Sequence, residues 1–330
     1  MPGNLCDVPG VLVGHATDAI GMTGCTAVLF DRPAVVGVDV RGSSPETRGT
    51  AGLGQTGIVR HRQGILLTGG SAFGLSATDG MIRYLEERGI GLDVGVARIP
   101  LVSAAVLFDL GVGSADARPD ATMGYEAAAS ARSGAFAEGS VGAGTGASVG
   151  NILGTEWAMK GGLGTASARP GGADEGLIVA ALVAVNAFGD VRDPGTGATL
   201  AGPRLDGGAL GDTVELLPAA AARVKWGENT TLGVVATNAR LNTSQVQKVA
   251  EMAHDGLART ISPVHTTVDG DLVFAAALGE VDATTDVVGA WGARVLSEAV
   301  VRAVHSAKGL PGLPSVSELQ PGGGSAGNNL

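Results

Sequence analysis

The chain has 330 residues, of which 45% are hydrophobic, 16% are charged and only 3% are aromatic. Its formal net charge of −10 argues against nucleic acid as a partner, because no basic face could displace phosphate counterions. Its longest apolar runs, such as 177–185, fall short of the roughly 20 residues that a membrane-spanning helix needs. We therefore expect a small partner that is not a polyanion, and no membrane contact.

The first 15 residues lack a basic stretch followed by a long apolar one, so we expect no signal peptide and a cytoplasmic location. Cys6 and Cys25 are the two cysteines, and one such pair in a long chain is more typical of reduced thiols than of a disulfide. The 55 glycines follow no repeat and indicate many tight turns and close backbone approaches.

The first third of the chain predicts buried strands followed by a helix. The apolar runs 26–30, 34–40 and 64–70 are nearly continuous, which is typical of strands buried on both faces. Residues 74–89 then repeat apolar side chains at helical spacing and end at a glycine. Ser71 stands near the start of this helix, where free backbone N–H groups can hold a carboxylate or a carbonyl oxygen.

The rest of the chain predicts a loop at 163–175 and then further strands and helices. We predict strands at 177–186, 231–238 and 272–279, and helices at 243–258 and 285–307. Buried strands and apolar helix faces together favour layered sheets covered by helices in a single α/β domain. We place this domain at 1–316 and expect the tail 317–330, which has few core-forming residues, to be disordered.

The sequence does not support metal or nucleotide chemistry. The five histidines and two cysteines show no spacing that is typical of metal ligands. Gly142, Gly144 and Ala147 match the pattern G-x-G-x-x-A, but the buried strand before it and the acidic residue about 20 positions after it are missing. We expect no cofactor and no metal.

Polar side chains also stand at the ends of two predicted strands. Asp269 and Asp271 flank a glycine just before the apolar run 272–279. They form either an Asp-Gly turn that enters a hairpin or a carboxylate pair that orients a hydroxyl or an ammonium group. Asn186 ends the most apolar strand, where its side-chain amide can donate to an oxyanion.

Residues 226–242 begin with polar side chains and continue into a strongly apolar run. One interpretation is a polar turn at Asn229 that leads into a strand. The other is that the chain cuts itself between Asn229 and Thr230, which makes Thr230 an N-terminal nucleophile. The freed α-amine, with an unperturbed pKa of about 7.7–8.0, can take the hydroxyl proton, so no histidine is required. Composition leaves both interpretations open.

A resemblance to a known family favours self-cleavage. The blocks that carry it are DVPGVLVGHATD (7–18), AVVGVDVRG (34–42), LTGGSAFGL (67–75), YLEERGIG (84–91), AAVLFDLGVG (104–113), GAGTGAS (142–148), NTTLGVVATNARL (229–241) and DGDLVFA (269–275). Through them the chain resembles, from residue 5 to about 310, the self-processing DmpA-like aminopeptidases. That family includes β-peptidyl aminopeptidases and nylon-oligomer hydrolases.

The resemblance implies a four-layer αββα sandwich of the type that ornithine acetyltransferases share. It implies scission of the domain into segments 1–229 and 230–316, with Thr230 as the nucleophile. It also implies a homo-oligomer of four or more subunits. The apolar run at 299–304 can supply part of such an interface, or it can belong to the core.

Further residues take their expected roles from the same resemblance. The position of Asn186 helps to stabilise the oxyanion, and the positions of Asp269 and Asp271 lie beside the nucleophile and its amine. This chain departs from some members by having Phe108 in place of a tyrosine and Asn151 in place of a lysine. Both departures concern substrate preference more than the cleavage chemistry.

We therefore predict an autoprocessing N-terminal-threonine amidohydrolase that cleaves amide bonds of small peptides or amino-acid amides through an acyl-enzyme on Thr230. Phe108, Asn151 and Ser71 are the expected pocket residues. One alternative is an endo-type hydrolase of 6-aminohexanoate oligomers. A second is an acyltransferase of the ornithine-acetyltransferase type.

Overall fold

The computed structural model describes residues 3–54, 57–171, 175–220 and 229–319. Within these ranges one large mixed sheet organises the chain. Its strands are β1 (Val11–Asp18), β2 (Thr23–Val40), β3 (Thr47–Arg48), β4 (His61–Thr68), β7 (Val102–Val106), β10 (Gly162–Ala168), β11 (Val179–Asn186), β14 (Thr230–Ala239) and β16 (Leu272–Val281). They lie in the order β10-β11-β14-β16-β2-β4-β7-β3, and β1 pairs with β2.

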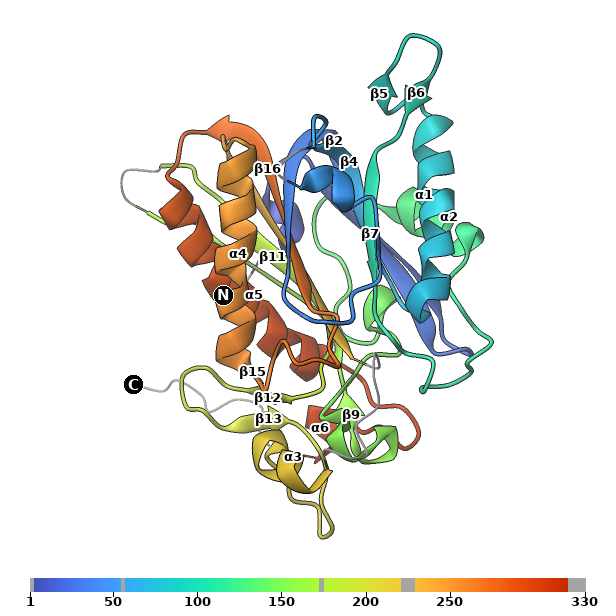
Figure 1. Ribbon diagram of the computed structural model, residues 1–330, viewed down its shortest axis with the longest axis vertical. Helices are drawn as coiled ribbons and strands as arrows, with labels where there is room; N and C mark the ends of the chain where they lie inside the picture. Colours follow the sequence, from blue (N-terminus) through green and yellow to red (C-terminus); the bar gives the residue numbers. More distant parts are fainter. Residues whose placement is uncertain (1–2, 55–56, 172–174, 221–228, 320–330) are drawn as a thin grey trace.

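Helices and short strands complete the domain. The helices are α1 (Ala77–Glu86), α2 (Ala121–Ser130), α3 (Thr213–Ala220), α4 (Thr243–Thr260), α5 (Thr285–Ser306) and α6 (Val316–Leu319). The short strands are β5 (Leu92–Asp93), β6 (Arg98–Ile99), β8 (Ser148–Val149), β9 (Met159–Lys160), β12 (Asp190–Arg192), β13 (Thr199–Ala201) and β15 (Ile261–Ser262). The β5–β6 hairpin projects from the top of the molecule in Figure 1.

The long strand β2 connects the two halves of the large sheet. Its first half pairs with β1 and β4, and its second half pairs with β16. The pairing with β4 shifts register between Leu29 and Ala34. The strands predicted at 26–30 and 34–40 are therefore one strand, because the polar segment between them shifts the register of pairing with β4 but stays extended.

The two halves of the sheet face each other across an apolar layer. Leu232 and Val234 of β14 and Phe274 of β16 pack in one buried cluster with Ile65 and Leu67 of β4. Their neighbours along each strand point the opposite way, as the alternation of side chains in a strand requires. This layer lies between the sheet halves, so both must present a second apolar face to helices.

Helices cover both of these outer faces, as Figure 1 shows. Helices α4 and α5 pack with β10, β11, β14 and β16 in one core cluster. Met81 of α1 and Ala127 of α2 pack with Ala27 and Leu66 in another. The order helix, sheet, sheet, helix confirms the predicted αββα fold.

The predicted helices are found with small shifts at their ends. Residues 243–258 lie in α4, where Asn242 and Gln245 form a capping box. The helix predicted over 74–89 starts as the 3₁₀ helix Ser71–Ser76 and continues as α1. The run 299–304 of α5 places four apolar side chains in the core, so most of it is structural. None of the described helices has the length and hydropathy needed to cross a membrane.

Two predicted boundaries are wrong. Residues 163–168, predicted as a loop, form most of the buried strand β10. The strand is hard to predict from the sequence because its residues are small, and they are small because α5 packs closely on it. A Cβ on Gly164 would lie 2.1 Å from the Ala299 carbonyl oxygen. The expected disordered tail also begins too early, since α6 includes residues 317–319 and buries Val316. Residues 320–330 lie outside the described residues.

We expect Phe274→Ala to lower the free energy of unfolding by about 3–5 kcal/mol, because it leaves a cavity between the two sheet halves. Urea unfolding in a Thr230→Ala background, which we expect to remain one continuous chain, measures the loss. Phe73, whose side chain is 55% exposed beside Arg118, is the matched control. Phe73→Ala should cost less than about 1 kcal/mol; equal losses would contradict the described core.

Candidate active site

Asn229 and Thr230 lie at the N-terminal end of β14, a strand with a neighbour on each side in the large sheet. β14 pairs antiparallel with β11, which sets Thr230 opposite Asn186, and parallel with β16. Asn229 forms an isolated parallel bridge with Asp269. All of these residues are buried. Residues far apart in the sequence therefore meet here, because β11 ends at this point and β14 and β16 begin at it.

The Thr230 hydroxyl lies against the carbonyl group that precedes it. Its Oγ1 donates a hydrogen bond of 2.5 Å to the Asn229 carbonyl oxygen, and the Gly270 N–H donates to the same oxygen at 2.9 Å. Only glycine fits at position 270, because a Cβ there would lie 2.7 Å from both Thr230 Oγ1 and the Ser44 carbonyl oxygen. A hydroxyl beside a carbonyl whose oxygen already accepts a backbone donor is an arrangement suited to attack on that carbonyl.

Two amide side chains border the Asn229–Thr230 bond. Asn186 donates from Nδ2 to the Phe108 carbonyl oxygen at 3.0 Å and accepts at Oδ1 from the Ser148 N–H at 2.9 Å. Asn151 donates from Nδ2 to the Asn229 side-chain oxygen at 2.9 Å. The side chain of Asn186 is thus held at both ends, and Asn151 contacts the residue that precedes the bond.

A buried lysine supports the segment behind Asn186. Lys160 donates from Nζ to the carbonyl oxygens of Gly144, Ala147 and Gly161 at 2.7, 2.8 and 2.9 Å. Burial lowers the pKa of Lys160 to about 7, against an opposing attraction from Asp109. The sequence offered no periodic signal for this residue. Its contacts fix the backbone that ends at Ser148.

Asp269 is held at the bottom of the site. Its Oδ1 accepts from the Phe188 N–H at 3.3 Å, and its Oδ2 accepts from the backbone N–H and the hydroxyl of Thr266 at 3.1 and 2.5 Å. Burial, followed by the charge of neighbouring Asp271, raises the pKa of Asp269 to about 7. This carboxyl group can therefore gain or lose a proton near neutral pH.

Asp271 contacts Thr231, the second residue of β14. Its Oδ1 accepts from the Thr231 N–H at 2.6 Å, and its Oδ2 accepts from the backbone N–H of His265 at 3.0 Å. β16, which follows directly, pairs parallel with β14 and antiparallel with β2. The hairpin interpretation of 269–271 is therefore wrong, because the strand enters the middle of the sheet.

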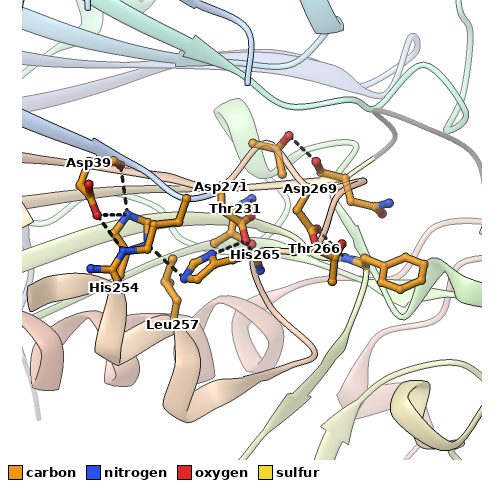
Figure 2. A network of polar contacts seen from close by, with 12 residues as sticks. Asp39, Thr231, His254, Leu257, His265, Thr266, Asp269 and Asp271 are labelled. Atoms are coloured by element: carbon orange, nitrogen blue, oxygen red, sulfur yellow. Dashed lines mark hydrogen bonds and ion pairs between the residues drawn. The ribbon is translucent and has the colours of Figure 1, made fainter. Parts of the chain in front are cut away.

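Sequence reasoning missed two histidines that contact this network, His254 and His265. His265 Nδ1 lies 2.9 Å from Asp271 Oδ2, and His265 Nε2 lies 3.2 Å from His254 Nδ1, as Figure 2 shows. One signal was available, because His254 occupies the apolar face of α4 beside Ala253 and Leu257. No group of three or more His, Cys, Asp or Glu in the described residues is arranged to hold a metal ion.

Two cavities border the Asn229–Thr230 bond. The larger, of about 660 Å³, is lined in part by Phe108, Asn151 and Asn229. The smaller, of about 400 Å³, includes Ser71, Phe108 and Thr230 in its lining. The structure thus brings the three predicted pocket residues to the bond, and Phe108 lines both cavities.

We expect Asp269→Asn to change how stability depends on pH. The folded state keeps the Asp269 proton up to about pH 7, whereas an unfolded carboxyl releases it near 3.9, so wild-type stability falls as pH rises between these values. The variant lacks this loss. Its free energy of unfolding relative to that of wild type should therefore increase by on the order of 3 kcal/mol between about pH 4.5 and 7.

Urea unfolding in the Thr230→Ala background across this pH range checks that gain. Asp255→Asn, at an exposed position of α4, is the matched control and should leave the pH trend unchanged. A constant difference between Asp269→Asn and its parent at every pH would contradict the raised pKa.

Comparisons with known proteins agree with this arrangement. The model of peptidase family S58 matches residues 3–316. The chain is 40% identical to an uncharacterized aminopeptidase of Mycobacterium leprae (strain TN), over 97% of this chain and 94% of that protein. It is 31% identical to the 6-aminohexanoate-oligomer endohydrolase of Kocuria sp. (strain KY2), over 84% of this chain and 76% of that protein.

The fold is similar to that of a solved structure, the L-aminopeptidase D-Ala-esterase/amidase of Ochrobactrum anthropi. The TM-score is 0.71 at 20% identity, covering 94% of this chain and 88% of that one. The predicted resemblance to the DmpA-like family is confirmed by the family match and the relatives. The chain belongs to peptidase family S58 and is a peptide-bond hydrolase.

Proposed function

We propose that the chain cuts itself between Asn229 and Thr230 and then works as an aminopeptidase with Thr230 as its N-terminal nucleophile. One observation carries the proposal: the Thr230 hydroxyl and the Gly270 N–H both donate to the carbonyl oxygen of Asn229. Attack by Oγ1 on this carbonyl carbon breaks the peptide bond and forms an ester. Water then hydrolyses the ester, which leaves a carboxylate on Asn229 and a free amine on Thr230.

The same threonine then serves the peptidase reaction. The free α-amine accepts the hydroxyl proton while Oγ1 attacks the substrate carbonyl. The C–N bond breaks, the leaving amine takes a proton, and the acyl group stays on Thr230 until water releases it. Asn186, which lies opposite Thr230 in the sheet, is the proposed side-chain donor to the oxyanion. Asp271 supplies negative charge close to the new amine, and Asp269 adds to it when it is ionised.

The larger cavity supports a substrate with an apolar portion and an amine. Phe108, Leu110, Ile152 and Phe188 are among its lining residues, and Glu156 is the one charged residue in the described lining. An ammonium group beside Glu156 and an apolar side chain against the rest would suit this lining. Short peptides and amino-acid amides with a free amine meet both requirements.

Oligomers of 6-aminohexanoate are a second candidate substrate class, because a methylene chain with a terminal amine fits the same mostly apolar lining. The relative from Kocuria sp. carries this activity in its name. Values of kcat/KM for aminoacyl anilides and for 6-aminohexanoate oligomers distinguish the two classes. The acyltransferase alternative gains no support from the relatives. A homo-oligomer and a cytoplasmic location stay predictions.

We expect Thr230→Ala to abolish both self-cleavage and peptidase activity, because it removes the attacking hydroxyl. Intact-mass spectrometry should show one full-length chain for this variant. Wild type should show two chains that separate between Asn229 and Thr230. Thr231→Ala is the matched control and should still be cut. Hydrolysis by the Thr230→Ala protein at the wild-type rate would remove Thr230 from its proposed role.

We expect Asn186→Ala to lower kcat by about 10²–10³, the usual loss for one oxyanion donor. Single-turnover kinetics on an aminoacyl anilide measure the acylation step directly. Circular dichroism establishes whether the fold is retained, since Asn186 also contacts Ser148 and Phe108. Acylation at the wild-type rate in a folded variant would leave Asn186 with a structural role alone.

A further inference from the structure

A chain of hydrogen bonds leads from the start of β14 through His254 of α4 to Asp39 of β2. Asp271 contacts His265, and His265 contacts His254, at 2.9 and 3.2 Å. His254 Nε2 then lies 3.0 Å from the backbone carbonyl oxygen of Asp39 at the end of β2. Figure 2 shows these residues in a continuous row. Through Asp271, the row connects the N–H of Thr231 with β2, the strand that pairs with β16.

The three contacts need three protons, one in each. The Asp39 carbonyl oxygen only accepts, so His254 Nε2 must carry a proton. Two neutral imidazoles have one ring proton each, which leaves one contact of the row without a donor. With an ionised Asp271, the row is complete only when the two histidines hold one additional proton between them. The hydrogen-bond pattern therefore gives the pair of histidines a single positive charge.

The surrounding groups place that charge on His265. Burial, with a smaller contribution from the nearby His265, lowers the pKa of His254 to about 4, so His254 stays neutral. Asp271 accepts from the Thr231 N–H and from the backbone N–H of His265, which suits an ionised carboxylate. On the far side, the Asp39 carboxylate lies 3.6 Å from His254 Nε2 and is paired with Arg41 at 2.8 Å.

The backbone at His265 is also unusual, since its φ of 57° lies in a region that non-glycine residues seldom occupy. This conformation lets both the backbone N–H and the ring Nδ1 of one residue reach Asp271 Oδ2. The side chain of Asp271 is almost completely buried. Such a two-point contact restricts the rotation of the carboxylate.

We propose that His265 is a positioning residue of this enzyme, which as an imidazolium braced by His254 holds Asp271 against the Thr231 N–H and offsets its buried charge. The inference rests on the proposed role of Thr230. Loss of the additional proton at higher pH leaves His265 Nε2 and His254 Nδ1 facing each other with no proton between them. This contact then opens, His265 is no longer braced against Asp271, and the start of β14 loosens. Turnover should therefore decline on the alkaline side.

Nitrogen-15 NMR of histidine-labelled Thr230→Ala protein tests the charge without requiring activity. At pH 6 we expect both ring nitrogens of His265 to be protonated while His254 carries one proton. His265→Asn and His254→Gln assign the signals, and asparagine tolerates the positive φ. A singly protonated His265 at pH 6 overturns the inference. Cleavage or hydrolysis by the Thr230→Ala protein would instead overturn the proposed function.

Kinetics test the positioning role. His265→Asn keeps an N–H donor near Asp271 but not the charge, so we expect kcat to fall about tenfold with KM changed less than about twofold. The alkaline decline of kcat should disappear in this variant. His61→Asn, at an exposed position of β4, should match wild type. A wild-type kcat and pH profile for His265→Asn would overturn the positioning role.

Discussion

The site depends on the hydrogen bond from the Gly270 N–H to the Asn229 carbonyl oxygen. This bond continues the parallel pairing of β14 and β16 past the first paired residues of the two strands. The carbonyl group before Thr230 is therefore held in place by the sheet. The Thr231 N–H to Asp271 Oδ1 bond fixes the next residue in the same way. The backbone is therefore held on both sides of Thr230, whose hydroxyl contacts that carbonyl oxygen.

Electrostatics impose the second constraint. Two carboxyl groups, Asp269 and Asp271, are almost completely buried with one residue between them, and a low dielectric makes two such charges costly. Protonation of Asp269 near neutral pH reduces the repulsion, as its raised pKa indicates. Backbone donors and His265 stabilise Asp271. Under the proposed mechanism the new amine of Thr230 would add a positive charge beside this pair.

Close packing explains the abundance of glycine and alanine. A Cβ on Gly164 of β10 would collide with α5, and a Cβ on Gly270 would collide with Thr230 Oγ1. The first glycine lets a helix pack on the sheet, and the second lets a backbone donor approach the nucleophile. On the proposed mechanism, the cavity next to Asn229 becomes the acyl site once that residue is released, and Phe108 connects it with the cavity at Thr230.

The sequence alone determined the α/β class, most strands and helices, and the residues at their ends, because burial and helical spacing are local patterns. Motif blocks, rather than periodicity, pointed to Thr230, Asn186 and the two aspartates. Only the tertiary structure decided that β10 is a strand, since its small residues reflect the approach of α5. It also decided that His265 contacts Asp271 and that His254 contacts His265. Contacts between a helix, a loop and the residue before a strand produce no periodic pattern in the sequence.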